Sequence, residues 1–239
     1  MQEPQDEQSR LQGQEPPEEG QQAEIPGGPM LNERAEEVFR GAWASLFFSG
    51  RIKGRTVLIC SADRREGAST VACGLALAGT VPAGTTRVAL VDFNLRHPSL
   101  HEYLNLPDTP GVADVLLDGL APEAAALRVN DALDMYPVGN SDGRILDLLR
   151  CGKIGQFLKT LWESYEHVLV DVAAVNHYPD AQVLAGVVGQ AVLVAHCELT
   201  PREAVAQAHK RLEAGGGTVA GLILNLRTYP IPRFLYRRV

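Results

Sequence analysis

The chain has 239 residues, of which 45% are hydrophobic, and a formal net charge of −7 at neutral pH. This length can bury one sizeable core. No apolar run approaches the ~20 residues that a membrane-spanning helix needs, and no apolar segment near the amino terminus is typical of a secretion signal. We therefore expect no direct membrane span and a cytoplasmic location.

The four cysteines are scattered among apolar or small neighbours, without the C-x-x-C pairing of zinc or redox sites. They are Cys60, Cys73, Cys151 and Cys197. The pattern predicts buried, reduced thiols.

Most of the negative charge lies in the first thirty residues, where seven acidic side chains stand against one basic, Arg10. This stretch is rich in Gln, Pro and Gly and has few large apolar residues, so the sequence predicts a disordered acidic tail at 1–30. Residues 31–226 form one nearly neutral domain, without the broad basic face that would indicate nucleic-acid binding. A short basic tail, 227–239, follows and is typical of a solvated terminus or of a contact with a protein or anionic headgroups.

A helix is expected first, over residues 35–48, because its apolar residues form one stripe at helical spacing. The stripe consists of Val38, Phe39, Ala42, Trp43, Leu46 and Phe47. Two interpretations stay open: the helix docks on the domain's own core, or it makes a subunit contact.

Apolar runs of strand length then alternate with helical patterns from about residue 55 to residue 225. The predicted strands are Thr56–Ser61, Arg87–Asp92, Leu133–Pro137, Val168–Val172, Ala191–His196 and Val219–Leu224. The predicted helices are Ser69–Gly79, Gly111–Leu117, Arg144–Leu149, Ile154–Tyr165, Asp180–Val187 and Pro201–Glu213. This alternation predicts a doubly wound, mostly parallel α/β sheet with helices on both faces, and ligands at the carboxyl ends of its strands.

The first predicted strand leads into a phosphate-type loop that lacks its lysine. The pattern G-x-x-x-x-G-K-[ST] uses glycine turns to aim backbone N–H groups at phosphates, a lysine to reach the β and γ oxygens, and a hydroxyl to hold Mg²⁺. Here Ala62 takes the first glycine's place and Ala68 takes the lysine's. The candidate nucleotide-binding residues are Glu66, Gly67, Ala68, Ser69 and Thr70, and Arg64 or Arg65 could supply a guanidinium. The fold is therefore expected to be a three-layer, P-loop NTPase-like one.

Carboxylates end two of the predicted strands, at Asp92 and Asp171. Because Mg²⁺ prefers oxygen ligands, these two residues and Ser69 are the candidate metal ligands, provided that Mg-nucleotide binding is retained. A third carboxylate, Asp180, begins the following helix. No residue is expected to be catalytic, and Asp92 and Asp171 are the residual candidates.

The order of these segments resembles the bacterial tyrosine kinase family, over about residues 33–226. The matches are Ser61-Ala62 with Glu66–Thr70, then Asp92, Arg96 and Pro98–Leu100, Gly111–Leu116, Val138-Gly139, Ile145–Leu149, the Asp171 strand, and Gly221–Asn225. The resemblance implies ATP or ADP with Mg²⁺ as ligand, with Asn225 beside the nucleotide. It also implies an inner-membrane co-polymerase, the chain-length regulator of capsule or exopolysaccharide export, as partner. The family's interface motif E-x-x-R-x-x-R appears as Glu37, Arg40 and Trp43.

The departures from the family pattern fall on the chemistry. The lysine has become Ala68, a second aspartate has become Asn94, and a D-x-P-P turn ends in Ala173-Ala174. The carboxyl-terminal tyrosine cluster is reduced to Tyr229 and Tyr236. These changes indicate a catalytically degenerate member, with no certain cofactor.

Three functions follow from the resemblance. The first is a degenerate protein that acts by binding the co-polymerase, peripheral at the inner face of the membrane through that partner. The second is a weak ATP-dependent tyrosine kinase or ATPase. The third, ranked last, is a positioning ATPase related to the chromosome-partitioning and division-site proteins. Self-association stays open, because Trp43 replaces the last arginine of the interface motif.

Overall fold

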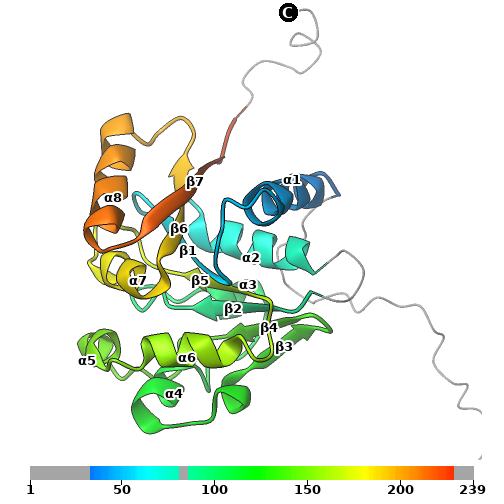
Figure 1. The fold of residues 1–239 in the computed structure, drawn as a ribbon, viewed down its shortest axis with the longest axis vertical. Helices are drawn as coiled ribbons and strands as arrows, with labels where there is room; N and C mark the ends of the chain where they lie inside the picture. The colour runs from blue at the N-terminus through cyan, green and yellow to red at the C-terminus, as the bar shows by residue number, and fades with distance from the viewer. Residues whose placement is uncertain (1–32, 81–85, 229–239) are drawn as a thin grey trace, which may run out of the picture.

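A seven-stranded sheet forms the centre of the computed structural model, which describes residues 33–80 and 86–228 (Figure 1). Its strands are β1 (Thr56–Ser61), β2 (Val88–Asp92), β3 (Leu127–Asn130), β4 (Leu133–Tyr136), β5 (His167–Asp171), β6 (Gln190–His196) and β7 (Thr218–Asn225). Their order across the sheet is β3-β4-β2-β5-β1-β6-β7, and every neighbouring pair is parallel except β3 with β4. The prediction of a doubly wound, mostly parallel sheet is confirmed.

Helices cover both faces of this sheet (Figure 1). One face carries α1 (Glu33–Trp43), the π-helical turn η1 (Ala44–Phe48), α2 (Ala68–Gly79) and α3 (Leu100–Tyr103). The other carries α4 (Val112–Asp118), the 3₁₀ turn η2 (Pro122–Ala125), α5 (Ile145–Arg150), α6 (Ile154–Leu161), α7 (Asp180–Val188) and α8 (Arg202–Ala214). Each face encloses its own hydrophobic core.

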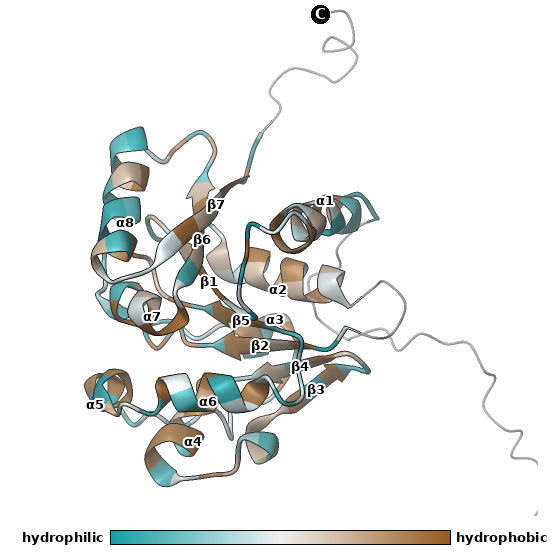
Figure 2. Cartoon of the chain, viewed as in Figure 1, coloured by the Kyte–Doolittle hydropathy of each residue, from teal (hydrophilic) through white to brown (hydrophobic). Residues whose placement is uncertain are grey.

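The central strands are mostly apolar, with polar residues at their ends, because both of their faces are covered. All six residues of β1 and all five of β2 are buried. Figure 2 shows the same contrast in hydropathy, with hydrophobic strands and hydrophilic outer turns on α8. The edge strand β7 is less covered, and Leu222 and Leu224 on it are exposed.

The structure adds elements that the sequence did not predict and shortens one. The edge strand β3 has only four residues, none of them fully buried, and so lacks an apolar signal. Asn130 turns the chain into β4 by accepting hydrogen bonds from the backbone N–H groups of Ala132 and Leu133, both at 2.9 Å. The predicted helix to Tyr165 ends at Leu161, where the guanidinium of Arg55 binds the carbonyl of Trp162 at 2.8 Å.

Helix α1 docks on α2 of the same chain through two glycines. A Cβ at Gly74 would overlap the ring of Phe39, and a Cβ at Gly79 would overlap the indole of Trp43. The bare backbone of α2 therefore lets both aromatic rings approach closely. Trp43 is only 2% exposed, and its ring also lies edge-on to His167 at 5.2 Å between centroids.

This packing bears on the predicted interface residues. Trp43 is buried inside the chain and offers no surface to a partner. The apolar stripe packs on the chain's own core except at Val38, which is 64% exposed. Glu37 and Arg40 are exposed on the outer side of α1, where Arg40 pairs with Glu36 at 2.9 Å. An interface through Glu37 and Arg40 stays a prediction.

Several other predictions concern burial and the chain ends. Cys60 and Cys73 are buried, whereas Cys151 and Cys197 are half-buried, and all four are free thiols. No helix within residues 33–80 and 86–228 has both the length and the apolar character to cross a membrane. The acidic tail at 1–30 and residues 229–239 of the basic tail, with Tyr229 and Tyr236, lie outside the described residues.

Candidate nucleotide-binding site

A cavity of about 420 Å³ opens at the carboxyl ends of β1, β2 and β5. It is lined by Ser61, Arg64–Thr70, Asn94, His97, Ser99, Tyr103, Val172–Ala174 and Tyr178. Its volume falls in the range of small-molecule sites. The structure thus brings the predicted loop residues Arg64 and Glu66–Thr70 together around one cavity, at the expected edge of the sheet.

The loop between β1 and α2 contains two residues with left-handed backbone angles directly before the helix. Arg65 and Gly67 both have left-handed backbone angles, with φ of 61° and 82°, and α2 begins at Ala68. The first N–H groups of a helix have no partner inside it and favour anions. Asn225 donates from Nδ2 to the carbonyl of Glu66 at 3.0 Å and so braces the loop from β7, without lining the cavity.

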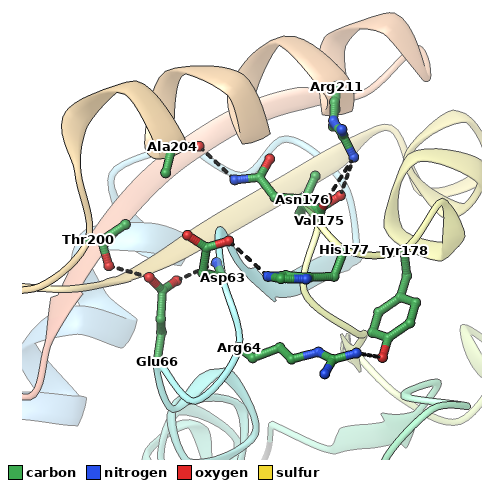
Figure 3. Close-up of polar contacts among 10 residues, drawn as sticks. All are labelled: Asp63, Arg64, Glu66, Val175, Asn176, His177, Tyr178, Thr200, Ala204 and Arg211. Atoms are coloured by element: carbon green, nitrogen blue, oxygen red, sulfur yellow. Dashed lines mark hydrogen bonds and ion pairs between the residues drawn. The ribbon is translucent and has the colours of Figure 1, made fainter.

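The buried side chain of Glu66 anchors the loop to its surroundings (Figure 3). Its carboxylate accepts the N–H of Asp63 at 2.9 Å and the hydroxyl of Thr200, which precedes α8. Both carboxylate oxygens are used within the protein. Glu66 therefore shapes the candidate site, and a direct contact with a nucleotide stays a prediction.

Ser69 lines the cavity and contacts the buried Asp171, which does not line it. Ser69 Oγ donates to Asp171 Oδ2 at 2.6 Å, and Asp171 is fully buried. Its other oxygen, Oδ1, has no hydrogen-bond partner among the described residues. A hydroxyl beside an unpartnered carboxylate oxygen is a donor set that suits Mg²⁺. Burial, followed by the charge of Asp92, raises the pKa of Asp171 well above its usual value.

Asp92 lies beside Asp171 in the register of β2 with β5 but faces its own loop. Its oxygens accept the N–H groups of Asn94 at 2.9 Å and of Ser99 and Leu100, both at 3.2 Å. Burial raises the pKa of Asp92 to about 6. Its visible role is to fold residues 94–100, which brings Asn94 and Ser99 to the cavity, and its role as a metal ligand stays a prediction.

No lysine side chain lies in this cavity. Ala68, which is 8% exposed, ends in a methyl group at the helix start. The cations on the cavity wall are Arg64 and Arg65, and neither forms an ion pair with a carboxylate among the described residues. The positive charge on the described wall of this cavity therefore comes from guanidinium groups.

The segment after β5 contributes residues that sequence reasoning missed. The guanidinium of Arg64 contacts the hydroxyl of Tyr178, and His177 Nε2 lies 3.1 Å from Asp63 Oδ1 (Figure 3). Two successive residues of the loop, Asp63 and Arg64, thus contact two successive residues of the connection from β5 to α7, His177 and Tyr178. No spacing in the sequence signals this match, because the two segments are more than a hundred residues apart.

A second missed feature is the partner of Asp180. This carboxylate, fully buried at the start of α7, accepts a bidentate pair of hydrogen bonds from Arg96, with both N···O distances at 2.9 Å. Asp180 therefore neutralises Arg96 and does not take part in the Ser69–Asp171 pair.

Comparisons with known proteins agree with this geometry. The chain is 30% identical to the tyrosine-protein kinase YwqD of Bacillus subtilis over 172 residues, covering 72% of each chain. It is 26% identical to the putative tyrosine-protein kinase CapB of Staphylococcus aureus over 192 residues, covering 79% of this chain and 83% of CapB. The solved chimerical protein CapA2B2 superposes with a TM-score of 0.73 at 27% identity, covering 81% of this chain and 85% of that one.

No protein-family model matches the chain. The identity to YwqD over most of both chains, the shared fold and the phosphate-type loop nevertheless agree. The chain therefore belongs to the family of bacterial tyrosine-protein kinases.

Proposed function

We propose that this chain is a catalytically degenerate member of the bacterial tyrosine kinase family. It acts in capsule or exopolysaccharide biosynthesis by binding a membrane co-polymerase and not by transferring phosphate. The observation that carries this proposal is the cavity with its loop, Ser69 and Asp171 in place but with Ala68 where the phosphate-binding lysine belongs.

The residues present support ligand binding more than catalysis. Ser69 and Asp171 would hold Mg²⁺, which neutralises phosphate charge when it is bound. Phosphoryl transfer also needs a positioned cation on the transferring group, and loss of such a clamp lowers rates by orders of magnitude. Asn94 adds to the loss, because its side-chain oxygen accepts the N–H of His97 at 3.2 Å and it carries no negative charge.

A weak tyrosine kinase or ATPase is the second candidate, favoured by Arg64 on the cavity wall. The two functions differ in what they need from the cavity: the kinase or ATPase requires bound Mg-nucleotide, whereas binding of the co-polymerase does not. Phosphotyrosine formed by the chain and lost in Asp171→Ala would favour the enzyme.

The first experiment is isothermal titration of the native chain with Mg-ADP and Mg-ATP, beside Ala68→Lys and Asp171→Ala. Restoring the lysine is expected to tighten binding about ten- to hundredfold, the effect of a hydrogen bond to a charged group. Asp171→Ala is expected to remove the Mg²⁺ dependence. ATP hydrolysis or tyrosine phosphorylation is measured on the same proteins. A measurable rate for the native chain that equals the rate of Ala68→Lys would contradict the degenerate assignment.

A second experiment tests the partner. The native chain is expected to be retained by the immobilised cytoplasmic segment of a chain-length-regulating co-polymerase, and equally so with Mg-ADP, with Mg-ATP or without nucleotide. Glu37→Lys serves to ask whether the exposed side of α1 takes part. Failure to bind in all three conditions would remove the proposed role.

A further inference from the structure

The cavity retains one cation that is well placed to bind phosphate. Arg64 lies in the loop itself, lines the same cavity as Ala68 and Ser69, and pairs with no carboxylate among the described residues. A guanidinium keeps its charge at any physiological pH and offers a planar fork of donors that suits phosphate oxygens. Arg64 and its neighbour Arg65 are both exposed, but only the side chain of Arg64 has a hydrogen-bond partner within residues 33–80 and 86–228.

Tyr178 holds this guanidinium in place. The Arg64 guanidinium lies 5.1 Å from the centroid of the Tyr178 ring and also contacts its hydroxyl. Figure 3 shows the Arg64 side chain extended from the loop toward that ring. A cation over a tyrosine ring is attracted by the ring's negative face, so a single orientation of a flexible side chain is favoured.

Tyr178 also contacts a second guanidinium, that of Arg96. Its ring lies 4.9 Å from the guanidinium of Arg96, which is locked by two hydrogen bonds to the buried carboxylate of Asp180. Asp180 is 0% exposed, so this anchor belongs to the core. A rigid chain of contacts therefore runs from the core to the cavity wall.

We propose that Arg64 is the oligophosphate-binding cation of this site, in the role that the loop lysine would fill, and that Tyr178 is its positioning residue. The ligand class is the Mg²⁺ complex of a nucleoside diphosphate or triphosphate. This inference rests on the proposed function, since it concerns the same cavity, but it does not require that phosphate be transferred.

The chain provides matched controls. Arg65→Gln removes the same charge from the neighbouring loop position, and His177→Gln disturbs the adjacent contact with Asp63 without touching Arg64. Tyr178→Phe keeps the ring and removes only the hydroxyl. Ala68→Lys asks whether a lysine can take over from Arg64.

The test is titration of these variants of the full chain with Mg-ADP, with Mg-pyrophosphate and with adenosine. Arg64→Gln is expected to lower the affinity for Mg-ADP and Mg-pyrophosphate about ten- to hundredfold and to leave the affinity for adenosine unchanged. Arg65→Gln is expected to weaken Mg-ADP binding less than Arg64→Gln does, because no described side chain orients the Arg65 guanidinium. His177→Gln is expected to change Mg-ADP binding less than about threefold. Tyr178→Ala is expected to weaken Mg-ADP about three- to tenfold, with Tyr178→Phe closer to the native chain.

Two double variants separate positioning from general disruption. If Tyr178 acts only by positioning Arg64, adding Tyr178→Ala to Arg64→Gln causes no further loss of Mg-ADP affinity. The two effects are then fully coupled in the double-mutant cycle. Ala68→Lys is expected to rescue Arg64→Gln. Urea denaturation of each variant without ligand verifies that the fold is intact.

The proposal is overturned if Arg65→Gln weakens Mg-ADP binding as much as Arg64→Gln does. It is overturned as well if the losses of Mg-ADP affinity in Arg64→Gln and Tyr178→Ala are additive in the double variant. It is also overturned if only Ala68→Lys binds Mg-ADP, and in that case retention by the co-polymerase segment still tests the proposed function by itself. If Arg64→Gln loses binding of Mg-pyrophosphate but keeps binding of Mg-ADP, the assignment of the ligand as a nucleotide is overturned.

Discussion

Gly67 and Asp171 are the two residues on which the cavity depends most directly. Gly67 has a φ of 82°, and a Cβ there would overlap the amide of Asn225, which braces the loop. Asp171 is buried with one unpartnered oxygen, so its charge is poorly solvated without a cation. The left-handed backbone at Gly67 and the buried carboxylate of Asp171 are both energetically costly, and such costs are typical of ligand sites and not of packed cores.

Replacing Gly67 by alanine is expected to destabilise the chain by about 2–3 kcal/mol, from left-handed strain and the displaced Asn225 hydrogen bond. Gly119 is the matched control, because its φ is 76° and nothing lies within 4 Å of the position that a Cβ would take there. Gly119→Ala should therefore cost only about 1 kcal/mol. Urea denaturation measures both, and equal losses would show that Asn225 does not brace the loop.

Removing the charge of Asp171 is expected to stabilise the ligand-free chain at neutral pH and to abolish its response to Mg²⁺. Burial raises the pKa of Asp171 well above its usual value and raises that of Asp92 to about 6. The folded chain thus binds more protons than the unfolded chain above pH ~4, so these groups contribute less stability as the pH rises through this window.

The stabilisation by Asp171→Asn should accordingly grow between pH 5 and pH 8, to about 1–3 kcal/mol. Asp180→Asn is the control, because it leaves Arg96 without its buried partner and should destabilise by about 3–5 kcal/mol. Urea denaturation of Asp171→Asn, Asp180→Asn and the native chain at several pH values measures these differences in stability. A pH-independent gap between Asp171→Asn and the native chain would contradict the pKa argument.

Among the elements, α1 and α2 form the pair whose packing matters most for the partner question. Gly74 and Gly79 open the surface of α2 to the rings of Phe39 and Trp43, so α1 is held by apolar burial. The charged residues of α1 stay on its outer side. The helix can therefore dock on its own chain and still offer a polar surface.

Trp43→Ala is expected to lower the free energy of unfolding by about 3–5 kcal/mol, as for other buried aromatic residues. Arg40→Ala should change it by less than about 0.5 kcal/mol, because its ion pair with Glu36 is exposed. Chemical denaturation compares the two. A small effect of Trp43→Ala combined with a loss of oligomer mass would return Trp43 to a subunit interface.

For the whole molecule, the parallel sheet places the ends of β1, β2 and β5 at one edge, and ligand binding there bridges elements far apart in sequence. A ligand that binds only the folded chain stabilises it by RT ln(1 + [L]/Kd), about 2.7 kcal/mol at a hundredfold excess over Kd. Saturating Mg-ADP is therefore expected to raise Tm by about 5–10 °C. Scanning calorimetry measures the shift, and an equal shift in Asp171→Ala would place the ligand elsewhere.

The sequence by itself determined six of the seven strands, the helices that cover them except α3 and η2, and the position of the phosphate-type loop. Strands covered on both faces are mostly apolar, and a strand followed by Glu66-Gly67-Ala68-Ser69-Thr70 and a helix encodes the loop locally. The pairing of Ser69 with Asp171 could be anticipated as well, because the carboxyl ends of parallel strands share one edge.

Only the tertiary structure decided what surrounds that loop. The contacts of Arg64 with Tyr178 and of Arg96 with Asp180 join segments whose spacing carries no periodic signal, because they depend on how two loops meet across the sheet edge. The turn of the Glu66 carboxylate toward Thr200, the brace from Asn225 and the burial of Trp43 against Gly79 have the same origin. Local sequence specifies the elements, whereas long-range packing specifies which side chains remain free to meet a ligand.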